Sequence, residues 1–413
     1  AAIKFTEEIV LATLSSYAND WSRALEFYNY VSSPPHGFPH TPSTLAAAVD
    51  ILGKNLEFPL ALSLLRSPSP PSPDRRSFRS IFNRLAAARL VHDALSVFHN
   101  DARFFNLHDL STYHLLVDAL CDHRLVSEAE DLALTSKNPP FPADTKIHNM
   151  ILRGWLKVQC WSRCRDFWEE MDRKGIDKDL HTYTIYMDIM SKSGKPWKAL
   201  KLYKEMKRKG WVLDVVVYNT VIQAAGLAEG ADQAVRALRE MMDRGCAPNA
   251  VSFNTVIKML CREGRAREGY SYLHQMRKKG CKPNVITYHC FFQHCTRPNE
   301  VLWMFDRMVE SGCRPRMDTY VMLMKKFGRW GFLRPVFMVW KKMEEHGVSP
   351  DAFAYNAMID ALLEKGMVEL ARKYDEEMLE KGLSAKPRKE LGTKYLARDP
   401  DDDNDDDDDD GFI

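Results

Sequence analysis

A glycine that recurs about once every 35 residues constrains the fold of this chain more than any other feature. Successive glycines lie 35, 35, 35, 32, 35 and 35 residues apart, and a methionine stands four residues before each one. A fixed period of roughly 20 to 50 residues is the signature of a repeat architecture. Each glycine follows a predicted helix that is often basic in its last turn, as a left-handed C-terminal cap does. The pattern therefore predicts stacked helical hairpins, marked by Gly175, Gly210, Gly245, Gly280, Gly312, Gly347 and Gly382 and by Met171, Met206, Met241, Met276, Met308, Met343 and Met378.

Residues 180–214 show the repeating unit most clearly. Apolar residues at helical spacing, such as Tyr183 and Met187, predict a first helix, and Gly194 lies in the predicted turn. A second apolar set that includes Met206 predicts a helix that ends at the recurring glycine. One second-helix position stays small except at Val336, which lets the two backbones approach closely. The repeats begin at Arg75, Leu110, Thr145, Leu180, Val215, Ala250, Val285, Met317 and Ala352, and the small residues are Ala94, Ala129, Cys164, Ala199, Ala234, Gly269 and Ala371.

The quality of the repeat changes along the chain, and this divides it into segments. The unit that begins at Val285 lacks three residues near 296–299, where we expect a tightened turn between its helices. The predicted segments are an N-terminal capping hairpin (1–41), a degenerate repeat with a Pro-rich linker (42–74), two divergent repeats (75–144), four well-matched repeats (145–284), the shortened repeat (285–316), two C-terminal repeats (317–386) and a disordered acidic tail (387–413).

Charge is distributed unevenly over the 413 residues. The formal net charge is +2, but residues 399–410 contain ten Asp, and without those ten the remainder carries +12. A basic body indicates a polyanionic partner, and an acidic tail is suited to compete for the same surface or to bind basic proteins. A solvated tail without specific function is an equally open interpretation.

The remaining bulk properties exclude several classes of protein. No apolar run approaches the length of a membrane span, so no membrane association is expected. The nine cysteines follow the repeat rather than a disulfide framework, which indicates a reducing compartment. The run from His289 to Cys295 holds metal-ligand residue types but lies within one predicted helix, so we predict no metal site. Because the first residue is Ala1 and not Met, either a leader has been removed or the chain is trimmed.

The repeat resembles the pentatricopeptide repeat. The carriers of the resemblance are the opening V-V-V-Y-N-T-V-I at 215–222, the ending E-M-x-x-x-G-x-x-P followed by D or N, and the whole unit AVSFNTVIKMLCREGRAREGYSYLHQMRKKGCKPN at 250–284. It covers at least residues 75–386. The resemblance implies an all-α, right-handed α-solenoid of about ten helix-turn-helix repeats. It is similar to the subtype built only from 35-residue units in plant organelles.

The resemblance also implies a function. Such proteins bind single-stranded RNA at about one base per repeat, through the fifth and last residues of each unit, while the second residue sandwiches the base. By this correspondence Asn149 with Asp179 favours U, Thr184 with Asp214 favours G, and the other two pairs favour pyrimidines, with C preferred. The expected central site is 5′-UGYY-3′. The pyrimidine pairs are Asn219 with Asn249 and Asn254 with Asn284, and the sandwich residues are Val216, Val251 and Ile286.

Outside these four repeats the correspondence fails, and the fifth and last residues form no standard pair. A basic row near the end of the first helices, which the family uses to neutralise phosphate, overlaps the central repeats. Leu227 interrupts the row and Glu364 ends it. The non-standard pairs are Arg79/Asp109, His114/Asp144, His289/Arg316, Val321/Asp351 and Asn356/Lys386, and the phosphate-contacting row is Lys157, Lys192, Arg262 and Arg329.

Three functions remain open from the sequence. The first is a non-enzymatic RNA-binding protein of the mitochondrial matrix, or alternatively of the chloroplast stroma, that acts on RNA processing, stability or translation by occupancy. The second is a structural subunit of the mitochondrial ribosome that holds rRNA and ribosomal proteins. The third is a protein-only scaffold, which leaves the recurring Tyr-Asn and Pro-Asn positions unexplained. Nothing after Ala385 resembles the nuclease or deaminase-like domains of some members, so no enzyme, cofactor or small-molecule substrate is expected.

Overall fold

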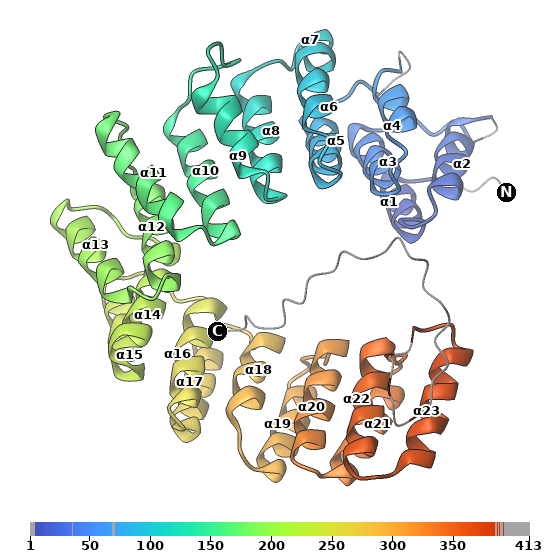
Figure 1. The fold of residues 1–413 in the computed structure, drawn as a ribbon, viewed down its shortest axis with the longest axis vertical. Coiled ribbons are helices and arrows are strands. Elements are labelled where there is room, and N and C mark those ends of the chain that lie inside the picture. The colour runs from blue at the N-terminus through green and yellow to red at the C-terminus, as the bar shows by residue number, and fades with distance from the viewer. Residues whose placement is uncertain are drawn as a thin grey trace. The chain divides into compact units, whose positions relative to one another are not determined.

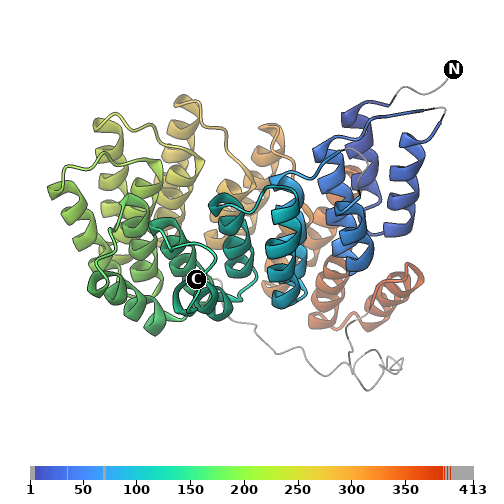
Figure 2. The same ribbon diagram turned by 90° about the horizontal axis from the view of Figure 1, so that it is seen from above.

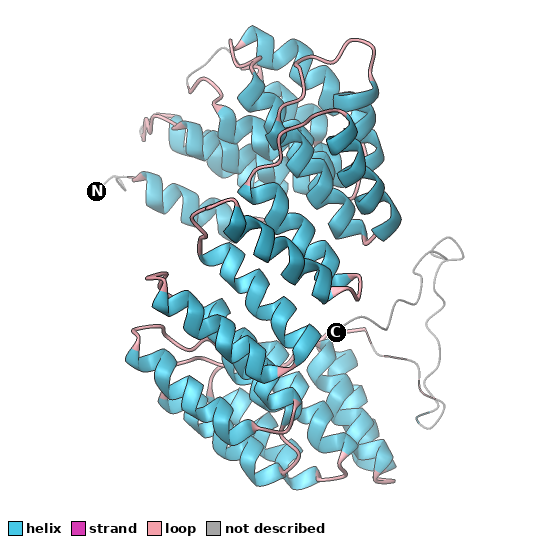
Figure 3. Ribbon diagram, turned by 90° about the vertical axis from the view of Figure 1, so that its left-hand side faces the viewer, coloured by secondary structure: helices cyan, strands magenta, loops and turns pink. Residues whose placement is uncertain are grey.

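The computed structural model describes residues 5–34, 36–67, 71–384, 386, 388 and 391, and the acidic run at 399–410 lies outside them. The described residues form helices joined by turns, and no strand occurs among them (Figure 3). The chain divides into a first unit, residues 1–224, and a second unit, residues 225–413. The division falls inside helix α14, Val215–Glu229. The predicted all-α class of stacked helical hairpins is confirmed.

In the first unit the hairpins follow one another in chain order (Figures 1 and 2). Its helices are α1 (Glu7–Ser16), α2 (Trp21–Ser32), α3 (Pro42–Lys54), α4 (Phe58–Leu65), α5 (Arg75–Ala87), α6 (Val91–Ser96), the π-helical turn η1 (Val97–Asp101), α7 (Ala102–Phe104), α8 (Leu110–Asp122), α9 (Val126–Glu130), the π-helical turn η2 (Asp131–Thr135), α10 (Thr145–Val158), α11 (Trp161–Arg173), α12 (Leu180–Lys192) and α13 (Pro196–Arg208).

The second unit repeats the same arrangement (Figure 1). Its helices are α15 (Ala231–Asp243), α16 (Ala250–Arg262), α17 (Ala266–Lys278), α18 (Val285–His294), α19 (Pro298–Glu310), α20 (Met317–Arg329), α21 (Leu333–Glu345), α22 (Ala352–Glu364) and α23 (Val368–Glu380). Across the described part of the chain, no helix is long and apolar enough to cross a lipid bilayer.

The first helix of most repeats begins at a fixed point because the side chain of the preceding residue caps it, and α20, which follows Arg316, lacks this side-chain bond. Asp144 accepts a hydrogen bond from the backbone N–H of Ile147 at 2.8 Å, and Asp351 accepts one from Ala354 at 2.9 Å. An Asp or Asn at this N-cap position satisfies a backbone donor that the helix leaves unpaired. The last residue of one repeat thus fixes the start of the next.

The glycine and methionine of each repeat belong to a single C-terminal cap. The seven glycines have φ between +66° and +78°, the left-handed conformation that a side chain disfavours. The residue after each glycine donates its N–H back to the methionine carbonyl, as Trp211 does to Met206 at 3.3 Å. This is the Schellman arrangement, which ends a helix by pairing its last free carbonyls. The methionine side chains are buried, so their role is core packing.

The core of each repeat lies between its two helices. An aromatic ring or a histidine at the fourth residue of each first helix is buried, and the small residues of the second helices, together with Val336, are fully buried. A Cβ added at Gly269 meets the Phe291 ring at 3.1 Å and Cys261 Sγ at 3.3 Å. The close helix contact predicted from the small residues is therefore real at this hairpin.

The divergent repeats at 75–144 lack the recurring glycine because their second helices contain the π-helical turns η1 and η2. A π-helical turn places one extra residue in the helix. In the first of these repeats the left-handed residue is Asn106, with φ +55°, and Leu107 donates to Ala102 O at 2.7 Å. Asn106 lies one residue beyond the glycine position of the other repeats, so the cap survives in a shifted register.

The expectation of a tightened turn in the shortened repeat is wrong. Helix α18 has 10 residues, whereas α16 has 13, so the deletion removes nearly a helical turn. The connections at residues 263–265 and 295–297 are equally long. Pro298 at the start of α19 and the extended φ of −61° and ψ of 134° at Cys295 end α18 early without compressing the turn.

We expect Gly210→Ala to lower the free energy of unfolding by about 1 kcal/mol, because Gly210 has φ +70° and alanine disfavours the left-handed region. A Cβ at Gly210 meets nothing within 4 Å, so the cost is conformational rather than steric. Urea unfolding followed by circular dichroism measures it. Arg208→Ala, in the last turn of α13, is the control and should be nearly neutral. Equal stability of both variants would contradict the cap.

Candidate nucleic-acid interface

The fifth and last residues of the repeat that begins at Thr145 are in direct contact. Asn149 on α10 donates from Nδ2 to Oδ1 of Asp179, the N-cap of α12, at 3.1 Å. The Asn149 side chain is buried, and its Oδ1 has no hydrogen-bond partner among the described residues. A buried acceptor left unpaired is costly in a folded protein, so this oxygen can accept a hydrogen bond from a ligand or a water.

Asp179 Oδ1 is used several times over. It also accepts from the backbone N–H of Thr182 at 2.7 Å and from the Thr182 hydroxyl at 2.8 Å. Burial raises the pKa of Asp179, but these hydrogen bonds and the one from Asn149 outweigh it and hold the pKa below its usual value. Every hydrogen bond that the structure records ends on Oδ1, so Asp179 keeps Oδ2 as an unused acceptor within the described chain.

The pair Asn254 and Asn284 has the same geometry in the second unit, but it leaves a donor unused instead of an acceptor. Asn254 Nδ2 donates to Asn284 Oδ1 at 3.2 Å, and Thr287 donates to Asn254 Oδ1 at 2.6 Å. Asn284 Oδ1 also accepts from the backbone N–H of Thr287 at 3.0 Å. The Nδ2 amide of Asn284 therefore remains as an unused donor among the residues the structure describes.

The hydroxyl three residues after the N-cap is a position, missed by the sequence reasoning, that orients the predicted base-contacting side chain. Thr182 and Thr287 are the third residues of their repeats, and both hold the N-cap side chain in a capping box. The signal was present, because Ser or Thr recurs at this phase. An alignment based on glycine and methionine passed over it. The buried members are Thr44, Ser77, Thr112, Thr182, Ser252, Thr287 and Thr319.

The third predicted pair, Thr184 and Asp214, makes other contacts. The Thr184 hydroxyl donates to the carbonyl of Leu180 in its own helix at 2.7 Å, while Asp214 caps α14 by accepting from Val217. Asn219 and Asn249 belong to different units, and their mutual geometry is not described. Asn249 is the N-cap of α16 and accepts from the Ser252 N–H at 3.1 Å.

The predicted sandwich residues are exposed apolar side chains. Val216, Val251 and Ile286 expose 57%, 53% and 57% of their surface, and all three occupy the second position of their repeats. Phe353, at the same phase of the last repeat, exposes 67% and was missed because its repeat has no standard pair. Exposed aliphatic and aromatic faces at one phase are suited to contact flat, apolar rings.

The predicted phosphate row separates into two kinds of residue. Lys157 pairs with Asp122, and Lys192 lies 3.0 Å from Asp188, so both cations are already neutralised. Arg262 and Arg329 are exposed and have no carboxylate partner among the described residues. The second unit therefore keeps its row cations available, whereas the first unit uses them within the protein.

Helices α16, α18 and α20 carry further positive charge beside Arg262. Lys326 donates to the carbonyl of Gln293 at 2.9 Å, which places it against the end of α18. The pKa of His294 is lowered by burial and by Lys326, Lys258 and Arg262. Three cationic side chains, Lys258, Arg262 and Lys326, thus lie close enough to His294 to lower its pKa.

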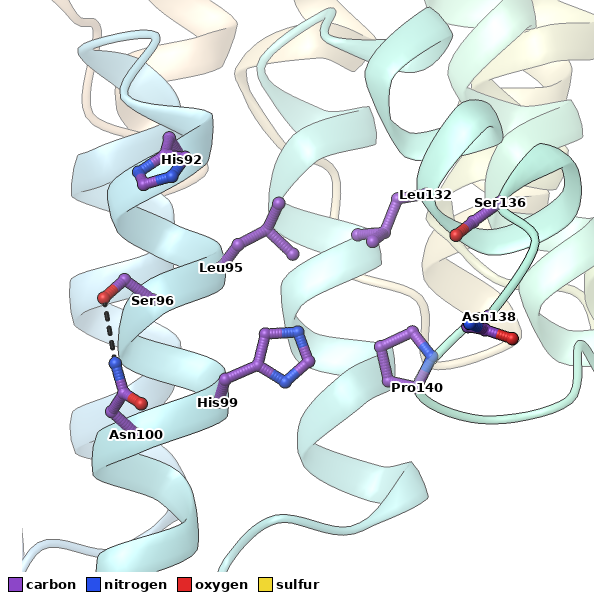
Figure 4. Close-up of a pocket in the computed structure, with 9 residues that line it drawn as sticks. All are labelled: His92, Leu95, Ser96, His99, Asn100, Leu132, Ser136, Asn138 and Pro140. Atoms are coloured by element: carbon purple, nitrogen blue, oxygen red, sulfur yellow. Dashed lines mark hydrogen bonds between the residues drawn. The ribbon is translucent and has the colours of Figure 1, made fainter.

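A hollow elsewhere on the protein lies apart from these residues. A cavity of about 450 Å³ in the first unit is lined from α6 and η1 by His92 and His99 and, across the gap, by Leu132 and Pro140 (Figure 4). Its Asn100 side chain donates to Ser96 at 3.1 Å. The cavity is built from second helices and the loop that follows, whereas the fifth-position side chains lie on first helices.

In the described residues no His, Cys, Asp or Glu cluster could hold a metal.

Tandem helical hairpins that present a polar pair and an exposed apolar side chain at fixed phases define a helical-repeat class of protein. A family model described as "PPR repeat family" matches residues 179–226, 213–262 and 248–297, and one described as "PPR repeat" matches 111–132, 294–313, 318–348 and 353–383. The chain belongs to the pentatricopeptide repeat family.

Relatives agree with this assignment. The chain is 59% identical over 398 residues, 95% of this chain and 88% of the relative, to "Pentatricopeptide repeat-containing protein At1g80550, mitochondrial" of Arabidopsis thaliana. It is 31% identical over 386 residues, 92% of this chain and 67% of the relative, to "Pentatricopeptide repeat-containing protein At5g15010, mitochondrial" of the same organism. Among solved structures it is similar to the maize pentatricopeptide repeat protein PPR10, with 23% identity, a TM-score of 0.41, and coverage of 92% of this chain and 60% of that one.

Asp179→Ala should lower the free energy of unfolding by about 1 kcal/mol at neutral pH, because α12 loses its N-cap. The folded-state pKa of Asp179 is depressed, so its ionised form stabilises the protein above the usual carboxyl range. That contribution disappears as the pH falls through the folded-state value. The difference between variant and wild type should therefore shrink on acidification, as urea unfolding at several pH values measures. A pH-independent difference would contradict the ionic cap.

Proposed function

We propose that this protein binds single-stranded RNA in the plant mitochondrion. It acts by occupying the RNA and not by catalysis. The observation that carries the proposal is the paired fifth and last residue, ordered by a buried hydroxyl and flanked by exposed apolar side chains. A base inserted between apolar faces presents its Watson–Crick edge to such a pair. The unpartnered Asn149 Oδ1 supports the proposal, because a base or an ordered water would satisfy it.

The chemistry of the two ordered pairs differs in the way that U and C differ. Uracil presents an N3–H donor on its Watson–Crick edge, which matches the unused Oδ2 acceptor of Asp179. Cytosine presents N3 as an acceptor, which matches the unused Nδ2 donor of Asn284. The preferences implied by the family resemblance thus have a direct hydrogen-bonding basis. Thr184 with Asp214 and Asn219 with Asn249 are proposed to contribute the G and second pyrimidine positions of 5′-UGYY-3′.

Backbone contacts complete the proposed interaction. Arg262 and Arg329 are proposed to contact phosphate first, because neither must break an ion pair to do so. Lys157 and Lys192 must exchange a carboxylate for a phosphate, which cancels much of the gain. Bound RNA would be shielded from nucleases or held open for processing or translation.

The names of the relatives support a proposal for the compartment and the partners. Two relatives carry "mitochondrial" in their names, which supports the mitochondrion, and we assign the matrix because RNA is found there. A more distant relative, 24% identical over 47% of this chain, is named "Small ribosomal subunit protein mL104 (rPPR9)". Ribosomal proteins and rRNA are therefore a second candidate set of partners. Sedimentation with ribosomal particles through a salt-washed gradient would favour that candidate over a free factor.

Exchanging the last residue should exchange the base preference. Asn284→Asp replaces the unused amide donor with a carboxylate acceptor and keeps an N-cap residue, so C should give way to U by about tenfold at that position. Asp179→Asn should shift U toward C in the opposite direction. Fluorescence anisotropy measures both, with 5′-UGCC-3′ against 5′-UGCU-3′ for Asn284→Asp and 5′-UGCC-3′ against 5′-CGCC-3′ for Asp179→Asn. Asn100→Ala, in the outer cavity, is the neutral control, and unchanged preferences in both variants would refute base readout.

Removing one free cation should reduce the salt dependence of RNA binding. Arg262→Ala is expected to weaken binding to all sequences alike and to lower the slope of log K against log salt by about 1. Lys157→Ala should lower the slope less, because Lys157 is already paired with Asp122. Titrations at several salt concentrations measure the slopes. Equal slopes in the two variants would show that the ion pair does not decide phosphate binding.

A further inference from the structure

The last repeat, residues 352–386, has its fifth-position side chain covered by a residue from beyond the repeat. Arg388 donates from one guanidinium nitrogen to Oδ1 of Asn356 at 2.9 Å. In two earlier repeats with Asn at this position, the fifth residue instead contacts the last residue of its own repeat, as Asn149 contacts Asp179 and Asn254 contacts Asn284. The last repeat ends in Lys386, which has no acceptor in its side chain to take that place.

Arg388 is fixed firmly in this position. Its side chain is only 5% exposed, and Nε and a terminal nitrogen both donate to Asp360 Oδ1, at 3.0 and 2.7 Å. A third nitrogen donates to the backbone carbonyl of Lys386 at 3.3 Å. On its other side the guanidinium lies 4.0 Å from the buried Asp375.

Displacing Arg388 would be expensive. Asp375 is buried, and its pKa is raised by burial, while Arg388 lowers it. Without Arg388 the Asp375 carboxylate would have no neighbouring cation that the structure records, and an uncompensated buried charge is strongly destabilising. A base cannot simply push the guanidinium aside. The Asn356 amide oxygen is therefore closed to a nucleobase, although the Phe353 ring of the same repeat stays exposed.

We propose that Arg388 closes the fifth-residue position of the last repeat and so removes that repeat from base reading. The inference rests on the proposed RNA binding. It assigns Arg388 as a specificity-determining residue: it removes Asn356 from base recognition and leaves the Phe353 ring to stack on any base. The ligand class is a single-stranded RNA whose 3′-terminal bound nucleotide is held without regard to its identity.

The test is selection from a random pool of RNA oligonucleotides of about ten nucleotides, at one base per repeat, with the full chain and three variants. Asn356→Ala should leave every base preference within about twofold of wild type. Asn254→Ala is the same change in a repeat whose last residue, Asn284, keeps an unused donor. It should lose about tenfold base preference at the position of that repeat. Arg388→Met keeps the aliphatic stem but removes the donors, so one additional preference of about tenfold should appear at the next 3′ position.

Two results would overturn the closure. One is the loss of a base preference in Asn356→Ala, and the other is the absence of any added preference in Arg388→Met. If wild type itself shows no base preference, the proposed base readout fails. The contact between Arg388 and Asn356 is then tested by thermal unfolding without RNA. The melting temperatures of Asn356→Ala, Arg388→Met and the double variant should be non-additive if Arg388 holds Asn356. Additive shifts would overturn the closure in that case as well.

Discussion

The side-chain hydrogen bond at the start of most first helices underlies both the fold and the proposed function. An Asp or Asn ends one repeat, caps the first helix of the next, and in two repeats also receives the amide of the fifth residue. A capping side chain must stay in one rotamer to reach the backbone N–H. The same constraint holds its remaining polar atom in a fixed direction. Asp179 and Asn284 are therefore preorganised by the requirement to start a helix, and the proposed base contact needs no further ordering.

The distribution of ion pairs explains why the repeats differ in the cations that they can offer to phosphate. In the first unit, Asp50 pairs with Arg84 at 2.6 Å and Asp122 pairs with Lys157, so cations on the first helices join one repeat to the next. In the second unit, Arg262 and Arg329 have no such partner in the described chain. Arg388 takes the joining role at the C-terminal end of the array, where it pairs with Asp360 at 2.7 Å. A cation that binds a neighbouring repeat is less able to bind phosphate.

Much of the fold could be predicted from the sequence because the repeat signals are local. The left-handed glycine and the buried methionine belong to one cap within six residues, so their phase shows in the chain itself. The π-helical turns at residues 97–101 and 131–135 were not predicted, since an extra residue leaves no distinctive local pattern. The tightened turn of the shortened repeat was predicted wrongly because a missing triplet can come from a turn or from a helix with equal ease. The structure shows that it comes from helix α18, which has 10 residues.

The sequence by itself determined the hairpin repeat, its period and the residue types at each phase, because caps and apolar spacing act over a few residues. Only the tertiary structure decided which of those residues are available. Asn149, Asn254 and Asn356 are the same residue at the same phase, yet they contact Asp179, Asn284 and Arg388 respectively. These partners lie 30, 30 and 32 residues away. Contacts across adjacent repeats depend on how the hairpins stack, and a local pattern cannot show which side chain arrives there.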